Sequence, residues 1–323
     1  MKKLLKHEGV VVPMVTPLTD SGSLDRRAVE RLVDFLLEGG VSGIFVLGTT
    51  GEGAGVHPEV RRQLVDGVVR RVESRALVYA GVGELQPEPI ATSNEYLTMG
   101  ADAVVARSPT GMTVGDMAPW FRGLLEGSRG PVILYNIPIL TKVSIPLDLV
   151  ECLRAHANCV GIKDSENNPR RLSELIQRFG KVQDFSIFVG VGKLMLEGLR
   201  LGANGIVPSV GNLIPDVCQG LWHSARCKDW AAARQFAERM NAVAAIYQAN
   251  RDLGESLSAL KAALSLKGIC GRYMSPPLET SEAGELRQVG EELNRLGLLS
   301  STPRSMVGGL GDSHSSKGAS PQP

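Results

Sequence analysis

The sequence predicts a TIM (β/α)8 barrel with a C-terminal helical extension. Short apolar runs rich in Val and Ile alternate with segments of helical period, and this unit recurs about every 25 to 30 residues. One run, at residues 160–163, ends abruptly in Lys163, the position in a barrel strand where such enzymes place their chemistry. The 323 residues, 43% of them hydrophobic, are enough to bury a core of this size.

The eight units follow in order from the N-terminal end. The first is a strand at 10–13 with a helix at 25–38, which ends at the stop signal Gly39-Gly40. The next seven strands are expected at 43–47, 77–80, 103–106, 132–135, 160–163, 187–189 and 205–207, with helices at 58–72, 89–99, 114–126, 147–155, 169–179, 193–201 and 213–223. A doubly wound sheet also alternates strands and helices, but eight units without a switch point favour a closed barrel.

The strand pattern stops after about residue 226, and three helices are expected at 230–248, 256–266 and 283–296. We therefore assign residues 1–225 to the barrel with its active site and 226–299 to a helical appendage packed on it. Residues 300–323 are rich in Ser, Gly and Pro, so their few apolar side chains cannot offset the entropy of ordering, and we expect a disordered tail.

Charge and cysteine usage exclude several classes of partner. Lys and Arg number 35 against 34 Asp and Glu, so neither nucleic acid nor an anionic membrane surface is expected to bind. The five cysteines are scattered without a C-x-x-C motif, which argues against structural zinc and favours free thiols in the cytoplasm. No signal peptide or membrane span is expected, because the first residues lack an apolar core and no apolar stretch reaches about 18 residues.

The second strand runs into the sequence GTTGEG at residues 48–53. Glycines let backbone N–H groups approach a ligand closely, and the hydroxyls of Thr49 and Thr50 add donors. The loop therefore suits a small carboxylate, with a plain tight turn as the alternative. Its spacing does not fit the G-x-G-x-x-G motif of a dinucleotide site.

The fifth and sixth strands end in Tyr135 and Lys163, which should share one face of the barrel. A phenol there can shuttle protons to a substrate oxygen. Burial of an ammonium in an apolar barrel mouth favours the neutral amine, which condenses with a ketone to a Schiff base. The alternatives are a lysine that reaches out to water and a tyrosine that only packs its ring. Because the protonated imine is an electron sink, a carbon–carbon bond beside it can form or break without metal or cofactor, and none is expected.

The seventh strand leads into Gly190-Val191-Gly192-Lys193. Barrels often hold anions at this helix start, so we include Gly190 and Lys193 among the candidate substrate-binding residues. A solvated lysine is the alternative, because the Walker spacing and its Ser or Thr are missing. The five histidines show no metal-ligand spacing, and no metal site is expected.

Four motifs together resemble the dihydrodipicolinate synthase / N-acetylneuraminate lyase family: GTTGE at 48–52, YNIP at 135–138, GIKDS at 161–165 and GANGIVPS at 202–209. The likeness extends over about residues 8–298, in family order. It implies a class I aldolase on a TIM barrel, usually a homotetramer. It also implies Lys163 as the Schiff-base lysine for pyruvate, Tyr135 as the proton-transferring residue, Thr49 and Thr50 at the pyruvate carboxylate and proton relay, and Val207 as a backbone contact.

The departures from the family pattern concern the second substrate. The synthase branch has an arginine two residues after the proline of the tyrosine motif, where this chain has Leu140, which cannot form a bidentate contact with a carboxylate. The synthases also carry a tyrosine pair after the fourth strand, where this chain has Ser108-Pro109-Thr110-Gly111. Sialic-acid lyases carry Asp-Glu where it has Gly192-Lys193. Lys193, together with Lys142, suggests an anionic distal group.

The sequence thus favours a lyase that cleaves a 4-hydroxy-2-oxo acid or a 2-keto-3-deoxy sugar acid to pyruvate and an aldehyde. Condensation by the synthase, or dehydration through the same imine, are alternatives within this chemistry. A metal- or phosphate-dependent barrel enzyme and a non-catalytic binding protein are alternatives outside it. We expect a homotetramer or dimer from the family resemblance.

Overall fold

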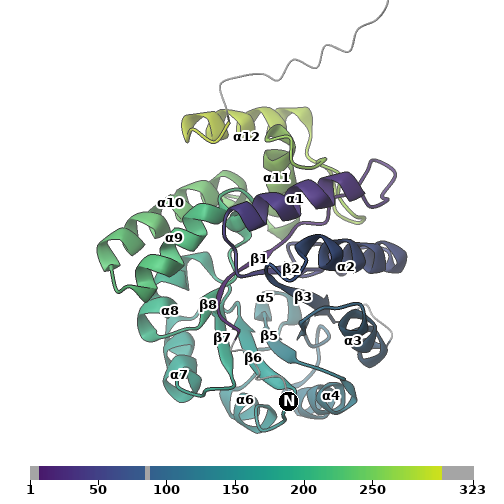
Figure 1. The fold of residues 1–323 in the computed structure, drawn as a ribbon, viewed down its shortest axis with the longest axis vertical. Coiled ribbons are helices and arrows are strands. Elements are labelled where there is room, and N and C mark those ends of the chain that lie inside the picture. Colours follow the sequence, from purple (N-terminus) through teal and green to yellow (C-terminus); the bar gives the residue numbers. More distant parts are fainter. Residues whose placement is uncertain (1–6, 84–87, 300–323) are drawn as a thin grey trace, which may run out of the picture.

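The computed structural model describes residues 7–83 and 88–299. Its strands close into a parallel barrel in the sequential order β1 to β8, which confirms the predicted fold (Figure 1). The strands are β1 Gly9–Pro13, β2 Gly43–Val46, β3 Leu77–Val82, β4 Ala103–Ala106, β5 Val132–Asn136, β6 Cys159–Asp164, β7 Ser186–Val189 and β8 Gly205–Ile206. Sequential order places the carboxyl ends of all these strands at one mouth of the barrel.

A helix follows each strand and covers the outside of the barrel. These helices are α1 Arg26–Glu38, α2 Pro58–Val72, α3 Pro89–Thr98, α4 Val114–Gly127, α6 Leu147–Leu153, α7 Pro169–Phe179, α8 Met195–Leu201 and α9 Pro215–Arg226. Residues at the N-termini explain where two of these helices begin. The Asp25 side chain caps α1 by accepting from the Ala28 N–H at 3.0 Å, and Pro58 is the first residue of α2. One short helix, α5 (Pro138–Thr141), was not predicted, because four residues carry no periodic signal.

The core has two layers, as alternation of side chains along barrel strands requires. The outer layer lies between strands and helices. The inner layer fills the barrel with Val11, Phe45, Tyr79, Ala103, Val105, Ile133, Tyr135, Ile137, Val160, Phe188 and Val207. A void of only about 10 Å³ remains within this layer, and Lys163 is one of the residues that border it. The interior of the barrel next to Lys163 is therefore closely packed.

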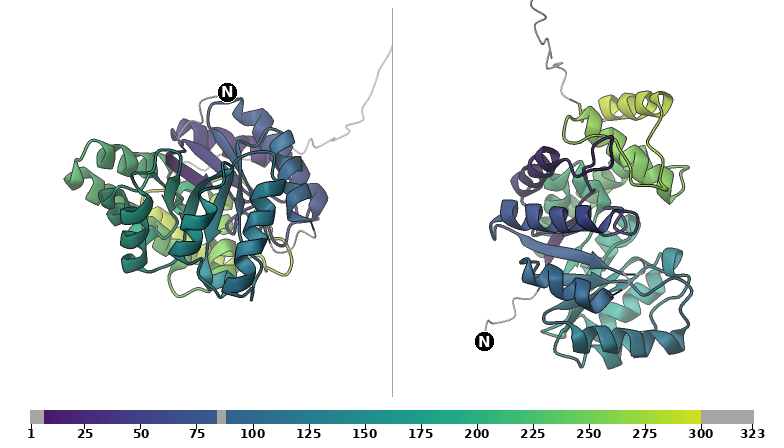
Figure 2. Two further views of the ribbon diagram at one scale, coloured as in Figure 1. Left: turned by 90° about the horizontal axis from the view of Figure 1, so that it is seen from below. Right: turned by 90° about the vertical axis from the view of Figure 1, so that its right-hand side faces the viewer.

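The predicted C-terminal extension consists of α10 Trp230–Gln248, α11 Leu253–Leu266 and α12 Ala283–Arg295. Helix α10 packs on α9, and α11 packs on both α10 and α12. Figure 2 shows α11 and α12 at one end of the molecule. Helix α11 begins ahead of the expected residue 256, because Asp252 and Glu255 form a capping box. The tail predicted to be disordered, 300–323, lies outside the described residues.

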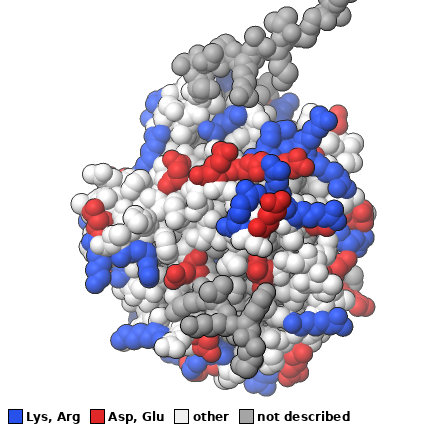
Figure 3. Space-filling view, in the orientation of Figure 1, with Lys and Arg blue, Asp and Glu red and all other residues white. Residues whose placement is uncertain are grey.

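The surface mixes charges of both signs. On the face seen in Figure 3, acidic and basic side chains alternate where α1 and α2 lie, and Arg71 of α2 pairs there with Asp34 of α1. Within residues 7–83 and 88–299 no helix has the length and apolar character to cross a bilayer.

Candidate active site

Lys163 occupies the carboxyl-terminal part of β6 and reaches into the barrel mouth. The register of the sheet pairs it directly with Tyr135 of β5. Its Nζ atom lies 4.1 Å from the centre of the Tyr135 ring and 4.9 Å from that of Phe45. Only 6% of the residue is exposed. The sequence prediction that Tyr135 and Lys163 share one face is therefore confirmed, and Phe45 is an aromatic neighbour that the sequence analysis missed.

Polar neighbours surround the hydroxyl of Tyr135. Its hydroxyl lies 3.3 Å from Oγ1 of Thr49. Burial opposes ionisation of the phenol, but the charge of Lys163 and the hydrogen bonds from Thr49, Lys163 and Ser165 outweigh it and hold the pKa of Tyr135 below its ordinary value of 10.0. A phenol with a lowered pKa is ionised to a greater extent near neutral pH, so a larger fraction of it can accept a proton.

Gly190, at the end of β7, leaves room for the lysine side chain. A Cβ atom at this position would lie 2.0 Å from Oγ of Ser165 and 3.2 Å from Cε of Lys163. The Gly190 N–H donates to the carbonyl of Asp164 at 2.8 Å, which fixes the backbone beside the lysine. Gly190 thus borders Lys163, and the structure shows a packing reason for glycine there.

A buried polar network fixes the two strand ends that carry Tyr135 and Lys163. The residues that follow them, Asn136 and Asp164, are also paired in the sheet register. The Asp164 carboxylate accepts from the Asn136 side chain at 3.0 Å and from Nε of Arg171 at 2.9 Å. Burial raises the pKa of Asp164, whereas the Arg171 charge opposes this rise. The network therefore holds both strand ends at one level.

The 48–53 loop folds tightly against β3. Leu47 and Glu52 adopt left-handed backbone conformations, with φ of 59° and 55°. A Cβ atom on Gly53 would lie 1.9 Å from the Leu47 carbonyl oxygen, and one on Gly81 would lie 2.2 Å from it. These two glycines therefore allow the close approach that turns the loop and presents Thr49 to Tyr135.

The C-terminal appendage holds the same loop through a buried ion pair. Nζ of Lys261, on α11, lies 2.5 Å from Oε1 of Glu52 and donates to the Tyr273 carbonyl at 2.5 Å. The second oxygen of Glu52 accepts from the Ser275 N–H at 2.6 Å. Lys261 is fully buried. The appendage is thus bonded to the loop that carries Thr49.

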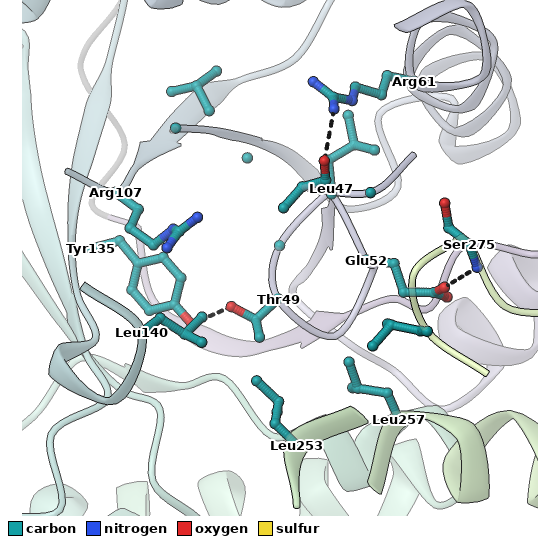
Figure 4. A pocket seen from close by; sticks show the side chains of 18 of the residues that line it. Leu47, Thr49, Glu52, Arg61, Arg107, Tyr135, Leu140, Leu253, Leu257 and Ser275 are labelled. Carbon is teal, nitrogen blue, oxygen red and sulfur yellow. Dashed lines mark hydrogen bonds between the residues drawn. The ribbon is translucent and has the colours of Figure 1, made fainter. Parts of the chain in front are cut away.

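A cavity of about 340 Å³ opens beside Tyr135 and Thr49 (Figure 4). Its walls come from loop 48–55, the ends of β3 and β4, α5, the start of α11 and segment 275–278. Leu140 of α5 borders it near Tyr135, and Arg107, which follows β4, lines the wall as well. Arg107 was not predicted to lie here, although its position directly after a strand is a signal for it. Leu253 and Leu257 of α11, which also line the cavity, were not predicted either.

The remaining predicted residues differ in their distance from this site. Val207 borders the small void under Lys163. Thr50 is half-buried beside Thr49 but does not line the cavity. Lys193 lies exposed on the short helix η1 (Gly192–Leu194) and does not line the cavity either. The structure therefore brings Lys163, Tyr135, Thr49, Gly190 and Val207 together, and the roles of Thr50 and Lys193 stay predictions.

Comparison with known proteins identifies the family. The model of the dihydrodipicolinate synthetase family matches residues 6–296. The chain belongs to this family. Members are Schiff-base-forming carbon–carbon lyases, so this family member is an enzyme of that class. Within residues 7–83 and 88–299, no three His, Cys, Asp or Glu side chains gather in a way that could hold a metal ion.

Relatives of this family member match most of its length. A 4-hydroxy-tetrahydrodipicolinate synthase of Laribacter hongkongensis is 35% identical over 70% of this chain and 78% of its own. One of Anaeromyxobacter is 30% identical over 90% and 98%. The dihydrodipicolinate synthase structure from Bacteroides thetaiotaomicron matches 89% of this chain and 98% of its own, with a TM-score of 0.85 and 30% identity. YagE from Escherichia coli, a family member solved in complex with pyruvate, matches 91% and 100% with a TM-score of 0.85 and 27% identity.

Proposed function

We propose that this enzyme is a class I aldolase that cleaves a 4-hydroxy-2-oxo acid or a 2-keto-3-deoxy sugar acid to pyruvate and an aldehyde. The observation that carries the proposal is the buried Lys163 amine, 4.1 Å from the ring centre of Tyr135, whose hydroxyl lies 3.3 Å from Thr49. Pyruvate bound to YagE supports pyruvate as the common product or substrate.

The proposed reaction uses the amine as nucleophile and the phenol as proton shuttle. The lysine nitrogen attacks C2 of the 2-oxo acid, and loss of water gives a protonated imine. The C3–C4 bond then breaks with its electron pair moving toward the imine, while Tyr135 takes the proton of the C4 hydroxyl and the aldehyde leaves. The enamine regains a proton at C3, and water hydrolyses the imine to pyruvate and free Lys163.

The neighbouring groups are proposed to orient the 2-oxo acid. Thr49 and Thr50 hold the carboxylate next to C2, and Thr49 relays the proton of Tyr135, to which it is already hydrogen-bonded. Val207 offers a backbone contact beside Lys163, and Gly190 leaves space for the substrate and the lysine. Lys193 is proposed as a contact for the distal end, and Lys193→Ala should then raise KM without changing imine formation.

Condensation by a 4-hydroxy-tetrahydrodipicolinate synthase is the second candidate, because the relatives named above carry that name. Two positions favour the aldolase instead. Leu140, an apolar side chain on the wall of the cavity, stands where the synthases have their arginine. The stretch that holds the tyrosine pair in the synthases reads Ser108-Pro109-Thr110-Gly111 here. Neither leucine nor threonine can hold a carboxylate as an arginine does.

Borohydride trapping tests the common step. Reduction of the enzyme with pyruvate should leave a pyruvate-sized adduct on Lys163, seen by intact mass and peptide analysis and absent in Lys163→Ala. A folded wild-type protein that forms no adduct would contradict the aldolase and the synthase together. Once trapping succeeds, comparison of 4-hydroxy-2-oxoglutarate cleavage with condensation of pyruvate and aspartate semialdehyde separates the two.

We also propose a homotetramer or dimer in the cytoplasm. Ile139 on α5 is 69% exposed, which supports a covered surface near the cavity. All five cysteines are free, as a reducing compartment allows. Light scattering on a size-exclusion column would give the mass of the assembly, and a monomer at micromolar concentration would contradict it.

A further inference from the structure

The side chain of Glu52 leaves the 48–53 loop toward the C-terminal appendage. Its Oε1 atom lies 2.5 Å from Nζ of Lys261, and its Oε2 atom accepts from the Ser275 N–H at 2.6 Å. The side chains of Glu52 and Lys261 are each 1% exposed. Because opposite charges attract each other more strongly away from water, this buried pair is a firm contact between the loop and α11.

The backbone of Glu52 binds the residue that faces Tyr135. Its N–H donates to the Thr49 carbonyl at 3.1 Å, which closes the turn of residues 49–52. The left-handed backbone of Glu52, with φ of 55°, is rare for a residue other than glycine and persists where surrounding contacts hold it. Figure 4 shows the two side chains leaving the loop in opposite directions, Thr49 toward Tyr135 and Glu52 toward Ser275. A displacement of Glu52 would therefore move Thr49 through a single turn.

The barrel holds the same turn from its other side. The hydroxyl of Thr16, which follows β1, donates to the Gly51 carbonyl at 2.6 Å, and the Gly53 N–H donates to the Gly48 carbonyl at 3.1 Å. The loop is thus fixed between the barrel and the appendage. Such support matters because reacting groups have to be held within about 0.5 Å of their productive geometry.

We propose that Glu52 and Lys261 are positioning residues, through which the C-terminal appendage holds the Thr49 hydroxyl against Tyr135. This inference rests on the proposed aldolase function, in which Tyr135 takes the proton of the C4 hydroxyl and Thr49 relays it. It gives the appendage a part in the reaction: α11 does not supply a reacting group, but its lysine fixes the geometry of the relay.

The test follows the ionisation of Tyr135 when the anchor is removed. Glu52→Gln keeps the size of the side chain and removes the charge that Lys261 binds. Because the hydrogen bond from Thr49 favours the phenolate, loosening the loop should raise the pKa of Tyr135, as Thr49→Val does. Ultraviolet titration of tyrosinate against Tyr135→Phe measures this pKa and needs no substrate. We also expect kcat/KM for aldol cleavage to fall about 10- to 100-fold, since a misplacement of about 1 Å has effects of this size.

Combining the two substitutions shows whether they act on one contact. If Glu52 acts through Thr49, the double variant Glu52→Gln, Thr49→Val should titrate as Thr49→Val alone does, because the same hydrogen bond cannot be lost twice. Glu52→Gln with Lys261→Met leaves no uncompensated charge and is the second variant should Glu52→Gln fail to fold. It also lacks the anchor, so it should raise the pKa of Tyr135 too.

Glu285→Gln is the matched control. Glu285 lies on α12 and pairs with Nε of Arg251 at 3.0 Å, so the variant makes the same substitution in an ion pair that lies within the appendage. Glu285 does not line the cavity. This variant should leave the titration of Tyr135 and kcat/KM as in wild type, even where urea unfolding shows a loss of stability.

Other results would overturn the proposal. If Glu52→Gln, or its combination with Lys261→Met, loses stability but keeps the wild-type titration of Tyr135, the pair is purely structural although the aldolase assignment stands. If Glu285→Gln shifts the titration equally, the cause is a general loosening of the appendage and not the anchor. If wild-type enzyme traps no pyruvate on Lys163, the proposed function itself fails and the catalytic role of Glu52 and Lys261 falls with it.

Discussion

Lys163 Nζ lies 4.1 Å from the centre of the Tyr135 ring, on the neighbouring strand and at the same level of the sheet. The contact couples the two residues that we propose as nucleophile and proton shuttle, because the lysine charge favours the phenolate form of the tyrosine. It makes the ionisation of Tyr135 depend on Lys163, which can be measured directly.

Replacing the lysine should raise the pKa of Tyr135. In Lys163→Met the burial that opposes ionisation remains, but the largest opposing influence is lost, so the pKa should rise above its wild-type value. The pH limb of kcat that reports Tyr135 should lie below pH 10 in wild type, since its pKa is lowered. Ultraviolet titration of tyrosinate, with Tyr135→Phe as the reference, measures the change.

Thr49→Val provides the comparison for this titration. It removes one of the smaller influences, the hydrogen bond to the phenol, and should raise the pKa of Tyr135 by less than Lys163→Met does. A Tyr135 titration that is identical in wild type and Lys163→Met would contradict the electrostatic coupling.

Gly190→Ala should disturb the site from the side of β7. The added methyl group would sit 2.0 Å from Oγ of Ser165 and 3.2 Å from Cε of Lys163, so it should displace the lysine and cost about 1–3 kcal/mol of stability. Pyruvate trapping should slow as well. In contrast, Gly123→Ala on α4 meets no atom within 4 Å and should stabilise the protein by about 0.5–1 kcal/mol. Urea unfolding of both variants would show whether their effects have opposite signs.

Lys261→Met should destabilise the chain by about 3–5 kcal/mol, because it leaves the Glu52 carboxylate buried without its cation. The double variant Lys261→Met, Glu52→Gln should recover part of this loss, since no uncompensated charge remains. Urea unfolding of wild type, Lys261→Met, Glu52→Gln and the double variant gives the four free energies of unfolding of a double-mutant cycle. A loss below about 1 kcal/mol in Lys261→Met would show that the pair does not stabilise the loop.

Arg171→Met should make stability depend on pH through Asp164. Burial already raises the pKa of Asp164, and removing the Arg171 charge that opposes the rise should raise it further. A carboxyl with a raised pKa binds its proton more tightly in the folded chain, so acid favours folding through this group. The deficit of Arg171→Met relative to wild type should therefore shrink as the pH falls from neutral toward the raised pKa of Asp164.

Arg170→Met is the matched control for this pH experiment. It removes the same charge from the neighbouring, exposed position of α7. Its stability should follow the wild-type curve at every pH. Thermal unfolding in buffers from neutral to mildly acidic pH distinguishes the two variants, and a deficit in Arg171→Met that does not change with pH would contradict the role given to Asp164.

The strand pattern alone was enough to predict the barrel, and the strand ends were enough to suggest the proposed nucleophile. Apolar runs such as Gly43–Val46 and Ala103–Ala106 are short and buried on both faces. They can therefore be recognised as strands without knowing which strands they pair with. Sequential parallel order then places every strand end at one mouth, which is why Tyr135 and Lys163 could be expected together.

The surroundings of these two residues depend on contacts between segments that are far apart in the sequence. The Glu52 carboxylate accepts a hydrogen bond from the Ser275 N–H, 223 residues away in the sequence. A local sequence pattern cannot predict a contact over such a separation. The same holds for Arg107, which lines the same cavity as Tyr135 because β4 and β5 pair side by side. Periodicity records which face of an element is buried, whereas the contacts that shape a cavity arise from the packing of distant segments.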